Sequence, residues 1–267
     1  MAFAKPNSER QNHERKDANR VYGVAPVLEI LKAGKRSVES ITIAENAQSP
    51  RVHELLQLAR ARGVIVNRAR KEVLNRLVEP GANHQGIVAA LSAATAKYAD
   101  ASDLLEILSN KIGTENPPLA VVLDGVEDPR NLGAIARTVE CAGADAIFLP
   151  ERRAVGLTDT VAKTAAGALE YVPVAKAVNL TRLLEEMKAR GIWTIGASVN
   201  AKQNYTDWDW RQPSAIVLGG EGAGLHRLVE ETCDVLVKIP LAGKIESLNV
   251  SVAAGVVLYE AKRQRNQ

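Results

Sequence analysis

Five polar side chains in the second half of the chain lie in, or just beyond, loops that leave strongly apolar segments. They are, in chain order, Asn131, Arg137, Glu221, Ser247 and Asn249. Amides, hydroxyls and carboxylates orient a substrate and assist proton loss, and a guanidinium stabilises a phosphate or a developing alkoxide. These residue types therefore favour chemistry on a polar substrate, provided that the fold brings their loops together.

The first of these loops leads into an expected helix that starts near Asn131. A helix N-terminus together with Arg130 and Arg137 is well suited to the phosphate backbone of a nucleic acid. The simpler alternative is that Asn131 only caps the helix and that Arg137 is a solvated side chain.

The second loop, Gly219-Gly-Glu-Gly-Ala-Gly, follows an apolar segment at 215–218. Glycines let the backbone approach a ligand closely. The loop lacks the usual dinucleotide spacing and the Lys-Ser/Thr of a triphosphate loop, which argues against a nucleotide-dependent oxidoreductase. Glu221 suits an organic cation, a hydroxyl or an arginine better than a phosphate; alternatively, it is a turn residue near a helix start.

The third segment, 235–261, reads as a buried strand to Ile239, a polar loop, and a helix rich in small residues. Ser247 or Asn249 is the expected N-cap of that helix, and capping alone would explain both residues. Small residues such as Ala242, Gly243 and Gly255 predict a rigid loop that other backbone approaches closely.

The elements around these loops predict an α/β fold. From residue 119 onwards, continuous apolar strands alternate with helices, which indicates a parallel sheet covered on both faces. Ligands bind such sheets beyond the carboxyl ends of the strands, where the three loops are expected. The strands are expected at 120–124, 146–149, 172–174, 193–197, 215–218 and 235–239, with helices at 132–142, 180–190 and 225–231.

The front of the chain has a different composition. Residues 1–20 carry almost no large apolar side chains and are expected to be disordered, whereas 21–92 predict a small α/β domain. A linker at 93–118 follows, with one expected helix at 101–108. Residues 21–92 contain ten basic against six acidic side chains, and 93–267 contain nineteen against twenty-two. This asymmetry favours a polyanion-binding module joined to a second domain with a different function. The alternative is ordinary scatter of surface charge.

The composition favours a globular protein of the cytoplasm. No apolar run approaches membrane-spanning length, and the N-terminus has no secretory hydrophobic region. Two cysteines far apart favour a reducing compartment and give no zinc-binding spacing, so neither a metal nor a membrane partner is expected.

Taken together, the motifs resemble those of a known family. Asn-x-Gly-x-x-x-Arg, Gly-Gly-Glu-Gly-x-Gly and Ile-Pro-Leu-x-Gly-x-x-x-Ser-Leu-Asn-Val-Ser-Val-Ala resemble the three motifs of the SpoU (TrmH) RNA ribose 2′-O-methyltransferases, over residues 119–265. The front domain, with Tyr22-Gly23 and the run from His84 to Ala89, resembles the substrate-binding domain of the RlmB-type 23S rRNA guanosine 2′-O-methyltransferases.

The resemblance implies a SPOUT fold with a trefoil knot, in which the C-terminal segment passes through a loop and binds S-adenosyl-L-methionine. It implies Asn131, Arg137, Glu221, Ser247 and Asn249 as the catalytic set. It also implies a cofactor pocket made by Ala197, Ser198, Leu218, Gly219, Gly220, Gly222, Ile239, Leu241, Ser247 and Leu248.

The implied partners are 23S rRNA, as a ribosome assembly intermediate, and a second copy of the chain bound through the knotted domain, with Val252, Val256 and Tyr259 as candidate contacts. The alternatives are a tRNA ribose methyltransferase, a resistance-type rRNA adenosine methyltransferase, and a non-catalytic RNA-binding factor. Tyr98, Tyr205, Trp208 and Trp210 either stack on RNA bases or, as is more common, belong to the core.

Overall fold

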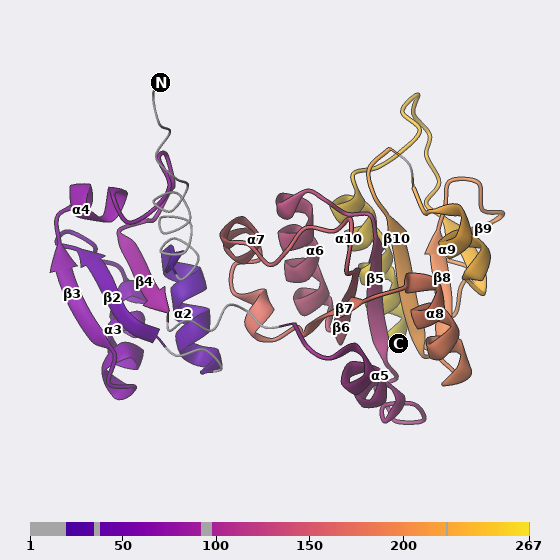
Figure 1. The fold of residues 1–267 in the computed structure, drawn as a ribbon, viewed down its shortest axis with the longest axis horizontal. Coiled ribbons are helices and arrows are strands. Elements are labelled where there is room, and N and C mark those ends of the chain that lie inside the picture. The colour runs from indigo at the N-terminus through magenta and orange to yellow at the C-terminus, as the bar shows by residue number, and fades with distance from the viewer. Residues whose placement is uncertain (1–19, 35–37, 92–97, 223, 267) are drawn as a thin grey trace, which may run out of the picture. The chain divides into compact units, whose positions relative to one another are not determined.

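The computed structural model describes residues 20–34, 38–91, 98–222 and 224–266, which form two compact units (Figure 1). The first unit contains the described residues up to Leu91 together with Leu157–Glu170, and the second contains Tyr98–Gly156 and residues 171–266. The expected disordered tail lies outside the described residues except for Arg20, which begins the first strand. None of the described helices is long and apolar enough to cross a membrane.

The first unit is a four-stranded sheet with helices on both faces. Its strand order is β1 (Arg20–Tyr22), β4 (Ile87–Leu91), β2 (Val38–Ala44) and β3 (Ile65–Ala69). Only β2 and β3 are parallel. Apolar side chains of α2 (Val24–Ala33) and α3 (Pro50–Ala61) form the main core with one face of the sheet. Leu74 of α4 (Lys71–Asn75) packs with Ala44 and Val88 in a smaller cluster. A segment with α7 (Asp159–Thr164) and a 3₁₀ turn (Ala168–Glu170) completes this unit.

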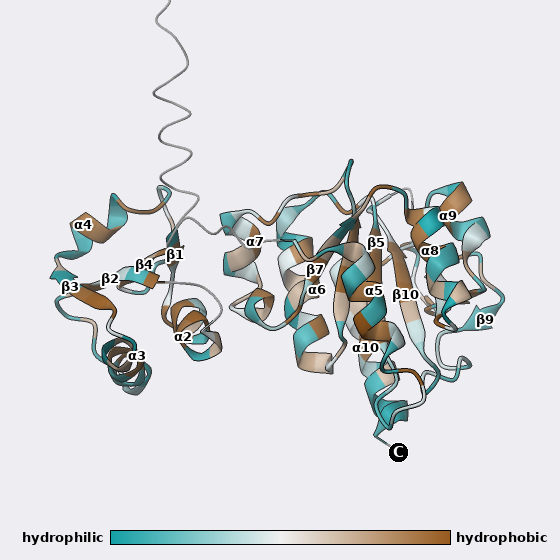
Figure 2. Ribbon diagram, turned by 60° about the horizontal axis from the view of Figure 1, so that its bottom comes forward, coloured by the Kyte–Doolittle hydropathy of each residue, from teal (hydrophilic) through white to brown (hydrophobic). Residues whose placement is uncertain are grey.

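The second unit confirms the expected parallel sheet. Its strand order is β7 (Val174–Ala177), β6 (Ala146–Pro150), β5 (Leu119–Asp124), β10 (Ser214–Gly219), β8 (Trp193–Ala197), β11 (Val235–Lys238) and β9 (Gln203–Asn204), and every neighbouring pair is parallel. The strand expected at 172–174 begins later, at Val174, because Pro173 has no N–H to give to the ladder. The central strands β5 and β10 are almost wholly apolar (Figure 2).

Helices cover both faces of this sheet. Side chains of α5 (Ala101–Ser109), α8 (Leu180–Ala189) and α9 (Arg227–Thr232) form one core with alternate residues of the strands. The other face is covered by α6 (Pro129–Ala142) and α10 (Val250–Arg265), which pack against each other (Figure 1). Helix α5 confirms the helix expected at 101–108 within the linker segment, and its Leu104, Leu105 and Leu108 are buried in this core.

The last turn of α10 is tied to the start of β5 and β10 by one side chain. The guanidinium of Arg265 donates to the carbonyl oxygens of Trp210 (2.7 Å), Pro117 (2.5 Å), Pro118 (3.1 Å) and Gln212 (3.1 Å). Two of these acceptors belong to prolines that precede β5. Arg265 therefore joins the end of α10 to the segment that leads into β5.

We expect Arg265→Ala to lower the free energy of unfolding by about 2 kcal/mol, because it removes charged donors from several partly buried carbonyls. Urea denaturation measures the change. Arg263→Ala is the matched control, since the exposed Arg263 pairs with Glu260 on its own helix. Equal free energies of unfolding for the two variants would show that the Arg265 hydrogen bonds do not stabilise the fold.

Candidate active site

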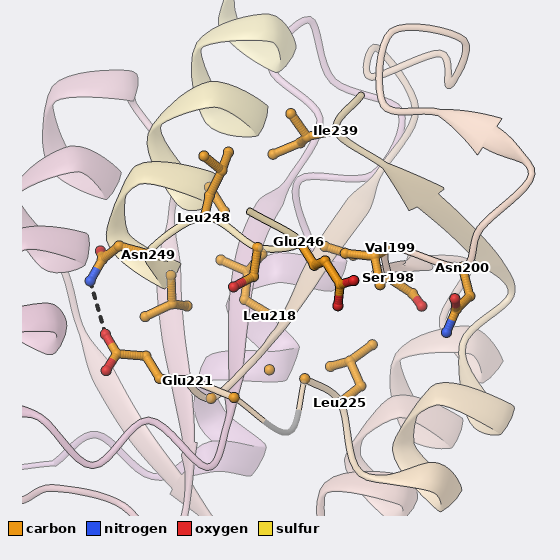
Figure 3. A pocket seen from close by; sticks show the side chains of 18 of the residues that line it. Ser198, Val199, Asn200, Leu218, Glu221, Leu225, Ile239, Glu246, Leu248 and Asn249 are labelled. Carbon is orange, nitrogen blue, oxygen red and sulfur yellow. Dashed lines mark hydrogen bonds between the residues drawn. The ribbon is translucent and has the colours of Figure 1, made fainter. Parts of the chain in front are cut away.

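A cavity of about 620 Å³ opens at the carboxyl ends of β8, β10 and β11 (Figure 3). Three segments form it: the turn after β8, the glycine-rich loop after β10, and the loop between β11 and α10. Because the strands are parallel, segments that are far apart in sequence meet at this edge. The cofactor-binding residues expected from sequence all line the cavity: Ala197, Ser198, Leu218, Gly219, Gly220, Gly222, Ile239, Leu241, Ser247 and Leu248.

Two acidic side chains in the same lining were not predicted. Glu230 of α9 and Glu246 of the last loop both line the cavity, and in Figure 3 the carboxylate of Glu246 lies opposite Ser198 and Val199. Glu246 directly precedes Ser247, a predicted site residue, and this position in the motif could have indicated that Glu246 lines the cavity. With Glu221 they give the cavity three carboxylates, and none of its described lining residues is a lysine or arginine. The lining therefore favours a ligand with a positive charge.

One wall of the cavity carries a hydrogen-bonded cluster of three predicted residues. Glu221 Oε1 accepts from Asn131 Nδ2 at 2.5 Å and from Asn249 Nδ2 at 2.9 Å, and Asn131 Oδ1 accepts a second bond from Asn249 Nδ2 at 3.1 Å. Figure 3 shows the bond between Asn249 and Glu221 at the edge of the cavity. Both amides thus fix the same carboxylate oxygen, Oε1, and neither of them bonds to Oε2.

The residues that cap α6 and α10 determine which side chains remain available for this cluster. Asp128, not Asn131, caps α6 by accepting from Arg130 N at 2.8 Å, so the capping alternative for Asn131 is wrong. Asn131 is only 7% exposed and faces inward. Asn249 does cap α10, with Oδ1 accepting from Ser251 N at 2.9 Å, while its amino group donates to Glu221. Asn249 therefore both caps the helix and belongs to the cluster, the two roles that the sequence left as alternatives.

The glycines of the second loop are required mainly by contacts within the protein. A Cβ on Gly219 would lie 2.0 Å from the carbonyl carbon of Gly224, and one on Gly220 would lie 2.2 Å from the carbonyl oxygen of Gly125. Gly222 and Gly224 have positive φ values of 83° and 66°. The close approach observed at this loop is therefore that of the protein's own backbone, and close approach to a ligand stays a prediction.

Of the five predicted catalytic residues, Arg137 is the one that neither lines this cavity nor belongs to the hydrogen-bonded cluster on its wall. It is exposed on α6, two turns from Asn131, and it lines neither this cavity nor the neighbouring one. Helix α10, which packs beside α6, exposes Val252 (51%) and Tyr259 (52%). An arginine and two apolar side chains are thus presented to solvent on the same pair of helices.

A second cavity of about 460 Å³ lies on the other side of Glu221. It shares Gly220, Glu221, Gly224 and Val250 with the first, and it also contains Asn131 and Arg153. At its base the buried Asp124 accepts from His226 N at 2.8 Å, and its other oxygen lies 2.9 Å from His226 Nδ1. The cluster around Glu221 therefore stands between two adjoining binding spaces.

Comparison with known proteins identifies this arrangement. Residues 118–259 match the model of the SpoU rRNA Methylase family, and residues 20–96 match the RNA 2'-O ribose methyltransferase substrate binding model. The chain belongs to the SpoU family. It is 45% identical to the "23S rRNA (guanosine-2'-O-)-methyltransferase RlmB" of Ralstonia nicotianae, over 91% of this chain and 95% of that one. It is 43% identical to the "Putative TrmH family tRNA/rRNA methyltransferase YacO" of Bacillus subtilis, over 92% and 96%.

A solved SpoU-type structure gives the same picture. The AdoMet-bound rRNA methyltransferase from Sinorhizobium meliloti matches with a TM-score of 0.73 and 25% identity, covering 96% of this chain and 90% of that one. Both the sheet and the preceding small unit therefore have counterparts in one solved protein.

One further expectation for this SpoU chain needs correction, and for Trp210 the core alternative is confirmed. The last loop is not closely approached at Gly243, where an added Cβ would meet nothing nearer than 4.0 Å, and residues 240–249 are all exposed. The loop stands out from the sheet in Figure 1. Trp210 is fully buried, with Nε1 donating to Tyr205 O at 2.8 Å, so it is a core residue and does not stack on bases.

Proposed function

We propose that this protein transfers the methyl group of S-adenosyl-L-methionine to the ribose 2′-oxygen of a guanosine in 23S rRNA. The observation that carries the proposal is the Asn131–Glu221–Asn249 cluster on the wall of a cavity in a SpoU-family fold. The name of the Ralstonia nicotianae relative, together with its near full-length match, supports the choice of 23S rRNA and of guanosine. A 23S rRNA substrate implies that the protein works in the cytoplasm.

The first cavity fits S-adenosyl-L-methionine in size and in chemistry. Its volume lies in the usual range for small-molecule sites. Leu218, Ile239 and Leu248 offer apolar contact for the adenine ring, and Glu230 and Glu246 suit the cationic ammonium of the methionine part. When bound, this cofactor supplies a methyl group that its sulfonium already activates.

The residues of the chain then have mainly a positioning task, because alignment supplies much of the barrier reduction in such a transfer. Glu221 Oε1 is held by two amide donors, so the remaining oxygen can accept from the ribose 2′-hydroxyl in the second cavity. Ser247 lines the first cavity next to the cluster and is a further hydroxyl for orientation. A guanidinium is permanently charged, so Arg137 is assigned to the phosphate and the developing alkoxide rather than to proton removal.

The proposal includes a homodimer in which the partner's Arg137 completes each site. Two observations support it: Arg137 is exposed, and the nearby Val252 and Tyr259 are half-exposed apolar side chains. The projecting loop also exposes Ile245 (78%) and Leu248 (39%), which an isolated chain leaves in water.

The proposal also includes the trefoil knot. Strand β11 lies between β8 and β9, whereas the next element, α10, packs on α6 across β10. The chain between Lys238 and Val250 must therefore return across the sheet edge at which the turn after β8 and the glycine-rich loop meet. Passage of this segment through the preceding loop is the arrangement that the family resemblance implies.

Methyl transfer to defined RNAs tests the proposed function. We expect the purified protein to transfer labelled methyl from S-adenosyl-L-methionine to a 23S rRNA transcript and not to total tRNA. Mapping of 2′-O-methylation in a deletion strain, compared with the complemented strain, should show one guanosine of 23S rRNA that loses its methyl group. Loss of a tRNA methyl group, or of an adenosine methyl group in rRNA, would overturn the assignment of substrate.

A further inference from the structure

The first unit contains a cavity of its own, of about 600 Å³. It lies between the end of β2, helix α4 and the loop that precedes β4. Its floor is apolar, with Ala44, Ala47 and Val78, and its rim is polar. The polar or charged lining residues are Asn46, Lys71, Asn75, Glu79, Asn83, His84 and Gln85.

The hydrogen bonds of His84 fix the chemistry of this rim. His84 is 3% exposed, and its Nδ1 accepts from Gly86 N at 3.0 Å. Nδ1 therefore carries no proton, and Nε2 donates to Asn75 Oδ1 at 2.8 Å. Burial lowers the pKa of His84, and the charge of Lys71 acts in the same direction.

Three rim amides use their carbonyl oxygens within the protein. Asn75 Oδ1 accepts from His84, Asn83 Oδ1 accepts from Gln85 N at 3.3 Å, and Gln85 Oε1 accepts from Val24 N at 3.2 Å. No bond from the amino groups of these three amides, or from the ammonium of Lys71, is found within the part of the chain that the structure describes. Apart from the carboxylate of Glu79, which is an acceptor, these rim residues therefore present hydrogen-bond donors.

The cavity is also held in shape by its own backbone. Gln85 has a φ of 52° and Gly86 one of 77°, so the loop passes through two successive left-handed residues. A Cβ on Gly86 would lie 3.2 Å from the Cβ of Ala47 and 3.3 Å from that of Ala44. The loop thus packs closely on the cavity floor. A ligand that binds here would therefore cost the loop little conformational entropy.

We propose that this cavity binds one unpaired nucleotide of the RNA substrate through the oxygens of its phosphate and base. The inference deepens the proposed function, on which it rests. The rim donors require a ligand rich in acceptors, Lys71 favours an anionic one, and Arg70 and Arg76 add exposed positive charge beside Lys71 and Asn75 in sequence. The apolar floor offers a surface for a base face, and sequence-specific RNA recognition uses nucleotides that are splayed out in this way.

A single isosteric change tests the proposal. Asn75→Asp keeps the oxygen that accepts from His84 Nε2 but replaces the rim's amino donor by an acceptor. We expect the dissociation constant for a 23S rRNA transcript, and the KM for that RNA, to rise about tenfold. The kcat at saturating RNA and the calorimetric affinity for S-adenosyl-L-methionine should stay at the wild-type values.

The matched control is Gln57→Glu, which makes the same amide-to-acid change at an exposed position of α3, a helix that packs on the other face of the sheet. Lys71→Ala is the second variant, in case Asn75→Asp alters the melting temperature. An equal loss of RNA affinity in Asn75→Asp and Gln57→Glu, or wild-type affinity in both Asn75→Asp and Lys71→Ala, would overturn the proposal. Because affinity is measured without methyl transfer, failure of the proposed reaction is seen separately, in the wild-type protein.

Discussion

Replacing Asn131 by alanine should lower kcat for RNA methylation by about a hundredfold or more, which is the usual effect of losing one fixed hydrogen-bond donor at a reacting centre. Asn131 supplies the 2.5 Å bond to Glu221 Oε1 and the acceptor for Asn249 at 3.1 Å. Its loss frees both the carboxylate and the amide to rotate. Single-turnover methyl transfer to a 23S rRNA transcript measures the effect.

The same variant should still bind S-adenosyl-L-methionine. Asn131 lines the second cavity and not the first, so the calorimetric affinity for this cofactor should stay within about threefold of wild type. Glu140→Ala, on the exposed side of the same helix, is the control for changes in α6 itself. Full activity of Asn131→Ala, or a loss of transfer matched by an equal loss of cofactor affinity, would remove Asn131 from the positioning role.

The part of the site that sequence could predict is the set of residues in loops that follow parallel strands. The buried runs that become β5, β10 and β11 are continuous and apolar, so their ends could be placed within a residue or two. Loops after parallel strands share one edge of the sheet, which brings Asn131, Glu221 and Asn249 together. The hydrogen-bonding pattern itself depends on where the helices start, and the sequence offered Asn131 as a cap where Asp128 is the cap of α6.

Other features depend on long-range contacts that no local pattern reports. The three-residue strand β1 is too short to show periodicity and exists because it pairs with β4, almost seventy residues later. Gly219 and Gly220 signalled close approach, but only the fold shows that the approaching groups are Gly224 and Gly125. The donor-rich rim in the first unit arises from the orientation of three amides, and their spacing in sequence suggests nothing of the kind.

Arg137 is the case in which the motif and the single chain disagree. The motif resemblance assigns it to catalysis, yet its side chain is exposed on α6 and lines neither cavity. A group that acts on the substrate phosphate must reach it, and the proposed dimer resolves the disagreement if Arg137 serves the site of the other subunit. In a two-fold symmetric dimer, both sites are then completed in the same way.

Subunit complementation distinguishes the two arrangements. Arg137→Ala and Glu221→Ala should each be inactive as homodimers. Co-expressed with different affinity tags and purified through both, the heterodimer should regain about half of the wild-type rate, because one of its two sites then combines an intact Glu221 with the partner's intact Arg137. If Arg137 acted within its own subunit, each site would carry one defect and the heterodimer would stay inactive. As a control for assembly, Val252→Glu in both subunits should lower the dimer fraction measured by sedimentation, and the recovered activity should fall with it, since Val252 is half-exposed on α10 beside α6.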